Sequence, residues 1–309
     1  MAAPSARGGR RLVTDLAPPR GVEVCYHPSV RRAAEVAEAL GRQAAERGLD
    51  VRVDALPEGD GAFLGELSAT DLLVCVGGDG TVLNASAYAA QTRTPIFGVR
   101  MGRLGFLTET VEEQAAADFA RVLDGEGRVE RRAMVQARLD GDGDGGTLHA
   151  LNDIVIGRAT LGRTIAVHAH IDGVMLAEYR ADALVIATAT GSTGYALSVG
   201  GPIMHPTSEE MILVPVAPHL TRANALVLPS GTDLRLSVER GFEGVMSVDG
   251  IHHRSVGSGA VVQITRSPRS VDFVRLGGAN DFYHNLARRL GWLRLDHVID
   301  EAQGPEAEG

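Results

Sequence analysis

The stretch LLVCVGGDGTVLNASAYAA, residues 72–90, begins as an apolar run, breaks at three glycines around Asp79, and continues in a pattern typical of a helix. We interpret it as a buried strand, a turn and a helix start. Bare glycine backbone at a helix start lets phosphates approach its free N–H groups closely. Taken alone, glycines around an aspartate form a tight turn more often than a catalytic site. The stretch is neither a G-x-G-x-x-G fingerprint nor a Walker A loop.

The flanking segments predict an α/β domain. GVEVCYH (21–27) is typical of a strand, residues 29–48 have apolar positions at helical spacing, and LDVRVDAL (49–56) alternates with a period near two. TPIFGVRMG (94–102) adds another strand. We therefore expect an open α/β sheet over residues 22–130, with ligands beyond the carboxyl ends of its strands.

The pattern changes at residue 131. Short alternating runs such as LNDIVIG (151–157), ALVIAT (183–188) and MILVPVAP (211–218) predict a β-rich, sandwich-like domain over 131–278. We expect a helix over 279–297 that returns to the first domain, with the site between the two domains. We expect residues 1–21 to be a flexible tail and 298–309 to be an acidic, disordered one.

Composition narrows the function. The chain has 309 residues, 44% of them apolar, and a net charge of −9, which favours a cytoplasmic protein and argues against a nucleic-acid partner or a membrane span. The first 21 residues hold no apolar core of signal-peptide length. Cys25 and Cys75 lie inside apolar runs and are expected to be buried free thiols. All 30 basic residues are arginine, so any phosphate chemistry must use backbone N–H groups, arginine and metal.

Further motifs follow GGDGT in order: GVRMGRLGFLTE (98–109), LNDIVIG, YRADALVIATATGSTGYALSVGGPIMHP (179–206), VPVAPH (214–219) and SVDG (247–250). Together they resemble the ATP-dependent NAD kinase family over residues 22–292. The resemblance implies phosphorylation of the adenosine-ribose 2′-hydroxyl of NAD to give NADP. It also implies ATP or, in some members, polyphosphate as donor, a divalent cation such as Mg²⁺, and a homodimer or homotetramer.

The resemblance also implies roles for residues of this chain. Asp79 becomes the catalytic base, and the phosphate-side loop comprises Gly78, Gly80 and Thr81. The remaining matches belong to the dinucleotide pocket: Phe106, Asn152, Asp153, Arg180, Asp182, Thr193, Gly194, Tyr195 and Ser198. A carboxylate suits the first role, because phosphoryl transfer needs a group that orients the attacking hydroxyl and accepts its proton late.

This chain departs from the family pattern mainly in the acceptor pocket. Arg100 replaces the usual asparagine, Asp153 replaces a glutamate, and alanines flank Asp182. We expect Arg100 to pair with a carboxylate such as Asp153 or Asp182; binding an anionic group of the ligand, or pointing to solvent, are the alternatives.

The departures leave the acceptor open. NAD or NADH is the first candidate, and another nucleotide, nucleoside or hydroxylated metabolite is the second. A binding or regulatory protein with little turnover is a third, although the intact Asp79 argues against it. We assign no residue as a metal ligand. His168, His170 and Asp172 alternate along one predicted strand, which favours a solvated sheet face over an ion site.

Overall fold

The computed structural model describes residues 13–56, 70–102, 105–140, 146–160, 162–219, 224–278 and 280–292. Two compact units divide the chain after Leu276. The first unit holds every element except the helix α5 (Asp281–Arg289). The expected return of that helix to the first domain, and the expected acidic tail at 298–309, stay predictions.

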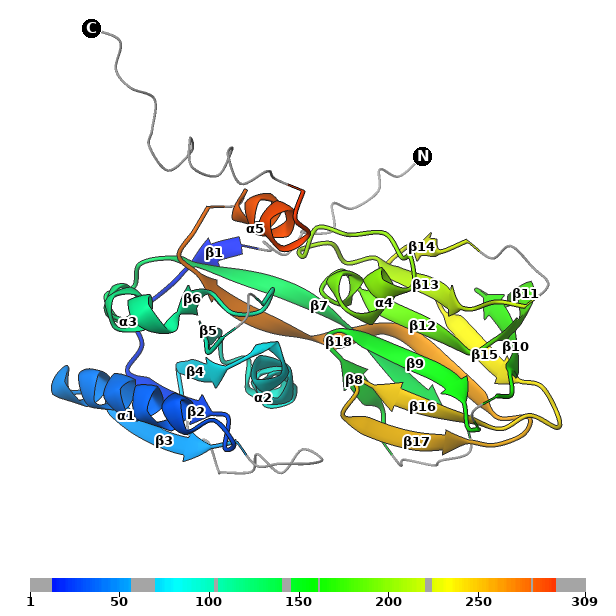
Figure 1. Ribbon diagram of the computed structural model, residues 1–309, viewed down its shortest axis with the longest axis horizontal. Coiled ribbons are helices and arrows are strands. Elements are labelled where there is room, and N and C mark those ends of the chain that lie inside the picture. The colour runs from blue at the N-terminus through cyan, green and yellow to red at the C-terminus, as the bar shows by residue number, and fades with distance from the viewer. Residues whose placement is uncertain are drawn as a thin grey trace, which may run out of the picture. The chain divides into compact units, whose positions relative to one another are not determined.

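The N-terminal part of the first unit is an open α/β sheet, as predicted (Figure 1). Its strands are β1 (Val13–Asp15), β2 (Gly21–Tyr26), β3 (Asp50–Ala55), β4 (Leu72–Gly77), β5 (Ile96–Arg100) and β6 (Thr110–Val111). Its helices are α1 (Arg31–Glu46), α2 (Asp79–Thr92), the short 3₁₀ turn η1 (Glu112–Gln114) and α3 (Ala115–Leu123).

The C-terminal part is β-rich, which confirms the predicted fold class. Its first strands are β7 (Arg128–Leu139), β8 (Leu148–Ala150), β9 (Asp153–Arg158), β10 (Ile165–Ile171), β11 (Val174–Ala181) and β12 (Ala183–Thr188). The 3₁₀ turn η2 (Gly191–Thr193) and the short helix α4 (Tyr195–Ser198) follow. The last strands are β13 (Met211–Val216), β14 (Leu226–Leu228), β15 (Leu234–Val238), β16 (Gly244–Val248), β17 (His252–Val256) and β18 (Val261–Arg275).

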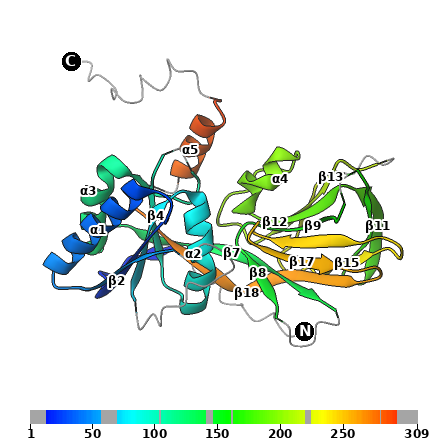
Figure 2. The same cartoon turned by 60° about the horizontal axis from the view of Figure 1, so that its bottom comes forward.

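Parallel pairing places the helices of the α/β part on both faces of its sheet. The order β5-β4-β2-β3 is parallel throughout. The small residues of α1 recur at Ala33, Ala37 and Ala44 and pack with Phe119 of α3 on one face. Val82 and other residues of α2 pack against the opposite face (Figure 2). Every residue of β4 is buried, as its unbroken apolar run predicts for a central parallel strand.

Two long strands, β7 and β18, join the two parts of this unit. They pair antiparallel over most of their length and lie side by side in both views (Figures 1 and 2). The C-terminal end of β18 pairs parallel with β5, whereas its N-terminal half pairs with β15. A second sheet, β14-β13-β12-β9-β16-β17, packs on the first through apolar residues such as Ile156, Leu213 and Ile264.

Two outcomes concern individual expectations. Val13–Asp15 falls in the range predicted as a flexible tail, but it pairs with Arg128–Glu130 as strand β1. All three residues are exposed, so no buried periodicity marked them as a strand. Cys25 and Cys75 are free and fully buried on neighbouring strands, as expected, with their sulfurs 3.3 Å apart. Among the described residues, no helix combines the length and apolar composition that a membrane span requires.

Candidate functional site

Asp79 is the first residue of α2, directly after the buried strand β4. Gly78 is the N-cap of the helix, and its backbone N–H donates to Oγ1 of Thr81 at 3.3 Å. A side chain at Gly77 would collide with Thr81, since its Cβ would lie 2.1 Å from that same oxygen. The glycines therefore allow the strand to turn into the helix at once, and they leave Asp79 at the helix N-terminus, where a negative charge is favourable.

The Asp79 carboxylate is held by the chain that follows β5. Its Oδ2 accepts the backbone N–H of Phe106 at 2.8 Å, and its Oδ1 accepts that of Leu107 at 3.1 Å. Gly105 makes this approach possible, because a Cβ there would lie 2.0 Å from Oδ1. The direction of the carboxylate is thus fixed by these two backbone donors.

A cavity of about 320 Å³ opens at the start of α2. The residues that line it are His27, Pro28, Leu56, Gly78, Gly80, Thr81 and Asn84. Gly80 is exposed, and the first backbone N–H groups of a helix are unpaired within it. This end of α2 therefore has the features of an anion site.

Asn152 and Asp153 are positioned by Asp249 of the SVDG motif. The Asp249 carboxylate accepts the backbone N–H groups of Leu151, Asn152 and Asp153 at 2.8, 2.7 and 3.0 Å. Leu151 packs in the same apolar cluster as Val82 of α2, so this segment borders the helix that carries Asp79. The sequence motif contains Asp249, but its role was not predicted. The sequence signal for this role is an aspartate directly before a glycine, because aspartate tolerates the positive φ of a tight turn. The φ of Asp249 is 54°.

The segment 188–195 packs directly on Asn152. The backbone N–H of Thr188 donates to the Asn152 carbonyl at 2.9 Å, and a Cβ at Gly191 would lie 2.0 Å from that oxygen. Thr193 and Gly194 are half-buried, whereas Tyr195 and Ser198 are exposed. The start of this segment therefore lies against Asn152, and a shared pocket for the residues that follow stays a prediction.

Burial and charge give the two buried aspartates unusual protonation. Burial, with added repulsion from Asp249, raises the pKa of Asp153 to about 7. Burial also raises the pKa of Asp249 to about 6, although the three backbone N–H donors oppose that rise. Carboxylates with such pKa values can be protonated near neutral pH.

Arg180 and Asp182 lie away from this neighbourhood within the chain. Asp182 pairs with Arg158 at 3.1 Å, and the carbonyl of Asp182 accepts the Arg158 N–H. Arg158 ends the strand that Asp153 begins, so the two are about 17 Å apart along β9. Arg180 pairs with Glu178 and Glu239 at 3.2 and 3.6 Å. Asp182 therefore lies at the far end of β9 from Asp153 within one copy, and a role of Arg180 and Asp182 in the dinucleotide pocket stays a prediction.

Arg100, at the end of β5, differs from the favoured expectation. Its backbone is in register with Gly77, so it lies beside the turn that leads to Asp79. It is half-buried, and among the described residues no carboxylate pairs with its guanidinium. Asp182 pairs with Arg158 instead, and the backbone N–H of Asp153 donates to Asp249. The predicted pairing with Asp153 or Asp182 is therefore wrong.

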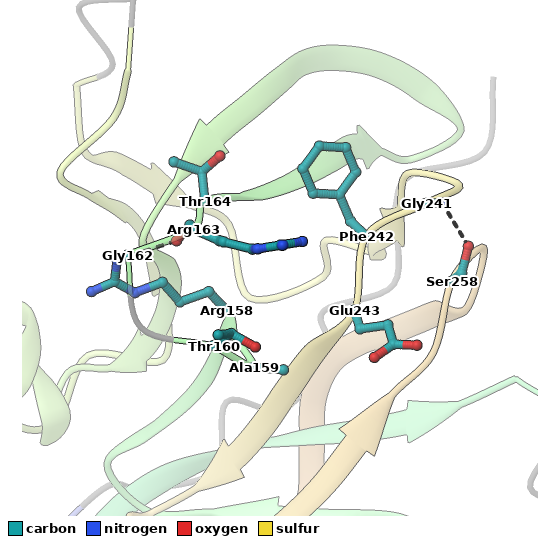
Figure 3. Close-up of a pocket in the computed structure, with 10 residues that line it drawn as sticks. All are labelled: Arg158, Ala159, Thr160, Gly162, Arg163, Thr164, Gly241, Phe242, Glu243 and Ser258. Carbon is teal, nitrogen blue, oxygen red and sulfur yellow. Dashed lines mark hydrogen bonds between the residues drawn. The ribbon is translucent and has the colours of Figure 1, made fainter.

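Two other arrangements do not include Asp79. A cavity of about 660 Å³ lies between the β9–β10 and β15–β16 connections, where Arg163 and Phe242 extend toward each other (Figure 3). Its described lining includes none of the predicted site residues. One imidazole and two carboxylates, of His168, Glu178 and Glu239, have ligand atoms within 4.8 Å of one another. His170 and Asp172 are not in this group, and Arg180 pairs with both of its carboxylates.

Comparison with protein families matches both parts of the chain. Residues 66–127 match the ATP-NAD kinase N-terminal domain, and residues 151–276 match the ATP-NAD kinase C-terminal domain. An NAD kinase of Dehalococcoides mccartyi is 33% identical over 87% of this chain and 95% of its own length. An NAD kinase of Chloroflexus aurantiacus is 35% identical over 87% of this chain and 98% of its own.

Two solved structures are similar in fold. Yeast NADH kinase complexed with NADH superposes with a TM-score of 0.79 at 24% identity, covering 90% of each chain. An NAD kinase from Archaeoglobus fulgidus in complex with ATP superposes with a TM-score of 0.68 at 26% identity, covering 85% of this chain and 98% of that one. The first likeness concerns the fold alone.

The raised pKa of Asp153 predicts a pH-dependent stability difference. A folded pKa of about 7 against an unfolded value of about 4 favours folding at low pH, and this contribution is lost as the pH rises through 7. Asp153→Asn removes that loss. The free energy of unfolding would be measured with urea at pH 5 and pH 8. From pH 5 to pH 8, the difference between variant and parent should shift by about 1–3 kcal/mol in favour of the variant.

Asp124→Asn is the matched control, because the Asp124 side chain is 61% exposed. Its difference from the parent should stay flat between the two pH values. An equally flat difference for Asp153→Asn would show that the Asp153 carboxyl titrates as an ordinary surface group.

Proposed function

The chain belongs to the NAD kinase family, and we propose that it transfers the γ-phosphoryl group of ATP to the adenosine-ribose 2′-hydroxyl of NAD, giving NADP and ADP. Members of this family are kinases. The proposal rests on the Asp79 carboxylate. It lies at the N-terminus of α2, and the backbone N–H groups of Phe106 and Leu107 fix its direction. Beside it lies a cavity with glycine backbone on its wall, suited to phosphates.

The proposed reaction needs little covalent chemistry from the protein. The 2′-oxygen of the ribose forms a bond to the γ-phosphorus while the bond from that phosphorus to the β–γ bridging oxygen breaks. Asp79 orients the hydroxyl and accepts its proton late in the transfer. The backbone N–H groups at the start of α2 face the transferred charge. ADP leaves with the bridging oxygen, so atoms and charge balance.

The donor is proposed to bring its own divalent cation. The described groups of three or more possible metal ligands include none with Asp79, and both Asp79 oxygens already accept backbone N–H groups. This setting fits Mg²⁺, which keeps several waters and binds through substrate phosphates with at most one or two carboxylates. The cation would neutralise the charge of the phosphates, because the chain has no lysine to do so.

The acceptor is proposed to lie against the neighbourhood of Asn152, with Phe106, Asp153, Thr193, Gly194, Tyr195 and Ser198 around it. Arg180 and Asp182 belong to this proposal only through assembly, since in one copy Asp182 pairs with Arg158 at the far end of β9 from Asp153, and Arg180 pairs with Glu178 and Glu239. A homodimer or homotetramer is the arrangement in which one copy can supply them to another. The alternative acceptor, another nucleotide, nucleoside or hydroxylated metabolite, is favoured by the substitutions in the acceptor pocket, Arg100 among them. We propose a cytoplasmic location.

The first prediction of the proposed reaction concerns Asp79. Asp79→Asn should fold and yet lose at least about 100-fold in turnover, since the amide cannot accept the hydroxyl proton. Turnover would be followed as NADP formed from NAD and ATP, with Asp124→Asn as the surface control. Activity of Asp79→Asn within a few-fold of the parent would remove Asp79 from the proton transfer.

A second prediction concerns the cation. Turnover should fall at least about 100-fold in excess EDTA and return when MgCl₂ is added beyond the chelator. The reason is that the proposed site offers backbone and arginine but no lysine for the phosphates. Undiminished turnover in chelator would mean that the protein alone neutralises the donor.

A third prediction concerns Arg100. Because its guanidinium has no carboxylate partner among the described residues, we expect it to contact an anionic group of the bound acceptor. Arg100→Asn should raise the acceptor KM at least about tenfold, measured against NAD, NADH and a panel of nucleosides. Arg93→Asn, at the exposed C-cap of α2 with φ 60°, is the control.

The outcome of the Arg100 test also separates the acceptors. A gain of NAD phosphorylation in Arg100→Asn would show that the parent is tuned to a different acceptor. An unchanged profile across the whole panel would contradict the contact and leave Arg100 as a surface residue.

A further inference from the structure

Three charged side chains are buried where β7 meets the end of β18. Glu130 is 5% exposed, Arg132 is 5% exposed and Arg275 is 7% exposed. Alternation along the paired strands puts all three on one face together with Phe273. Both guanidinium groups lie over the Phe273 ring, at 5.5 and 5.2 Å from its centre. Buried charges of this kind are costly unless they are closely paired.

Glu130 is the centre of this cluster. Its Oε1 accepts two hydrogen bonds from Arg132, at 2.9 and 2.7 Å, and lies 3.5 Å from Nε of Arg275. Its Oε2 accepts a hydrogen bond from Arg128 at 2.9 Å. Burial alone would raise the pKa of Glu130, but the charges of Arg132 and Arg275, together with the hydrogen bonds from Arg128 and Arg132, lower that pKa to about 2. Glu130 is therefore a carboxylate at every pH at which the protein would be assayed.

The Arg275 side of the cluster leads to Asp79. Nη1 of Arg275 donates to the carbonyl of Leu107 at 3.4 Å and to Oε2 of Glu109 at 3.0 Å. Oε1 of Glu109 accepts the backbone N–H of Leu276 at 2.7 Å, which ties the same segment to the end of β18. Leu107 is one of the two residues whose N–H groups hold the Asp79 carboxylate. Arg275 thus supports the segment 105–109, on which the direction of Asp79 depends.

The Arg132 side leads to the segment 188–195. Nη1 of Arg132 donates to Oγ1 of Thr190 at 3.3 Å, while the other two nitrogens of the same guanidinium bond Glu130. The carbonyl of Thr190 accepts the hydroxyl of Thr193, and Thr188 bonds Asn152. One arginine fork therefore links Glu130 to the segment proposed to hold the acceptor.

We propose that Glu130 is a positioning residue. By binding both Arg275 and Arg132, it fixes the distance between the segment that holds Asp79 and the segment that holds the acceptor. This inference rests on the proposed function for its kinetic consequence. It needs the planar guanidinium on each side, because a lysine ammonium cannot bond Glu130 and Thr190 from two edges at once. If the cluster only stabilised the strands, substitutions on its two sides would not affect NAD binding and turnover separately.

The kinetic test uses conservative substitutions. Arg132→Lys should raise the NAD KM at least about tenfold with kcat within about threefold, because the acceptor segment loosens. Arg275→Lys should lower kcat at least about tenfold with the NAD KM within about threefold, because Asp79 loses its fixed direction. In Arg132→Lys/Arg275→Lys the losses should be less than additive, since Glu130 links both.

The chain offers a matched control on the same two strands. Arg131 pairs with Asp272 through two hydrogen bonds of 2.8 and 2.9 Å, across the same ladder but on its opposite face. Arg131→Lys should leave kcat and KM within about twofold of the parent. Similar effects from Arg131→Lys and Arg132→Lys, or losses that add fully in the double variant, would overturn the positioning role.

Amide hydrogen exchange on the ligand-free protein keeps this test separate from the proposed function. Glu130→Gln should speed exchange at least about tenfold in both 105–109 and 188–195, whereas Arg131→Lys should change neither. If Glu130→Gln does not fold, Arg275→Lys should affect the first segment and Arg132→Lys the second. Unchanged exchange in both segments would overturn the inference. A parent that phosphorylates no NAD would instead defeat the proposed function alone.

Discussion

The direction of one carboxylate is the constraint on which the rest of this structure depends. Asp79 can accept the N–H groups of Phe106 and Leu107 only because residue 105 is glycine, whose missing Cβ leaves room for Oδ1. The strand β4 delivers Asp79 to the start of α2, and the glycines before it make the turn immediate. A carboxylate held at both oxygens loses little further freedom when a hydroxyl binds, which is how a positioned group contributes to phosphoryl transfer.

The two long strands connect the surroundings of that carboxylate to the β-rich part. Because β7 and β18 run through both parts of the unit, residues at their junction can contact the Asp79 side and the segment 188–195 together. The buried charges at this junction carry three positive groups, Arg128, Arg132 and Arg275, around Glu130. Nη2 of Arg275 is buried, and no described residue hydrogen-bonds it. An arrangement with such a cost is better explained by the geometry it enforces than by stability.

The sequence predicted the features that are local. The strand, turn and helix around GGDGT, the α/β order that follows and the later alternating strands all depend on periodicity and glycine placement within short windows. The ion pair between Glu130 and Arg275 could not be predicted, because it depends on pairing between strands that are far apart in sequence. The same holds for Asp249, which reaches back to Leu151, and for Asp182, whose partner Arg158 excludes the expected contact with Arg100.

The most direct test of the account is the chemical identity of the product. The purified chain would be incubated with ATP, MgCl₂ and NAD, and the dinucleotide product examined by phosphorus NMR with coupling to the ribose protons. The account predicts one new phosphomonoester, on the 2′-oxygen of the adenosine ribose, formed together with ADP and at least about 100-fold more slowly by Asp79→Asn. A phosphate on any other oxygen, or unchanged NAD alongside phosphorylation of another acceptor, would contradict it.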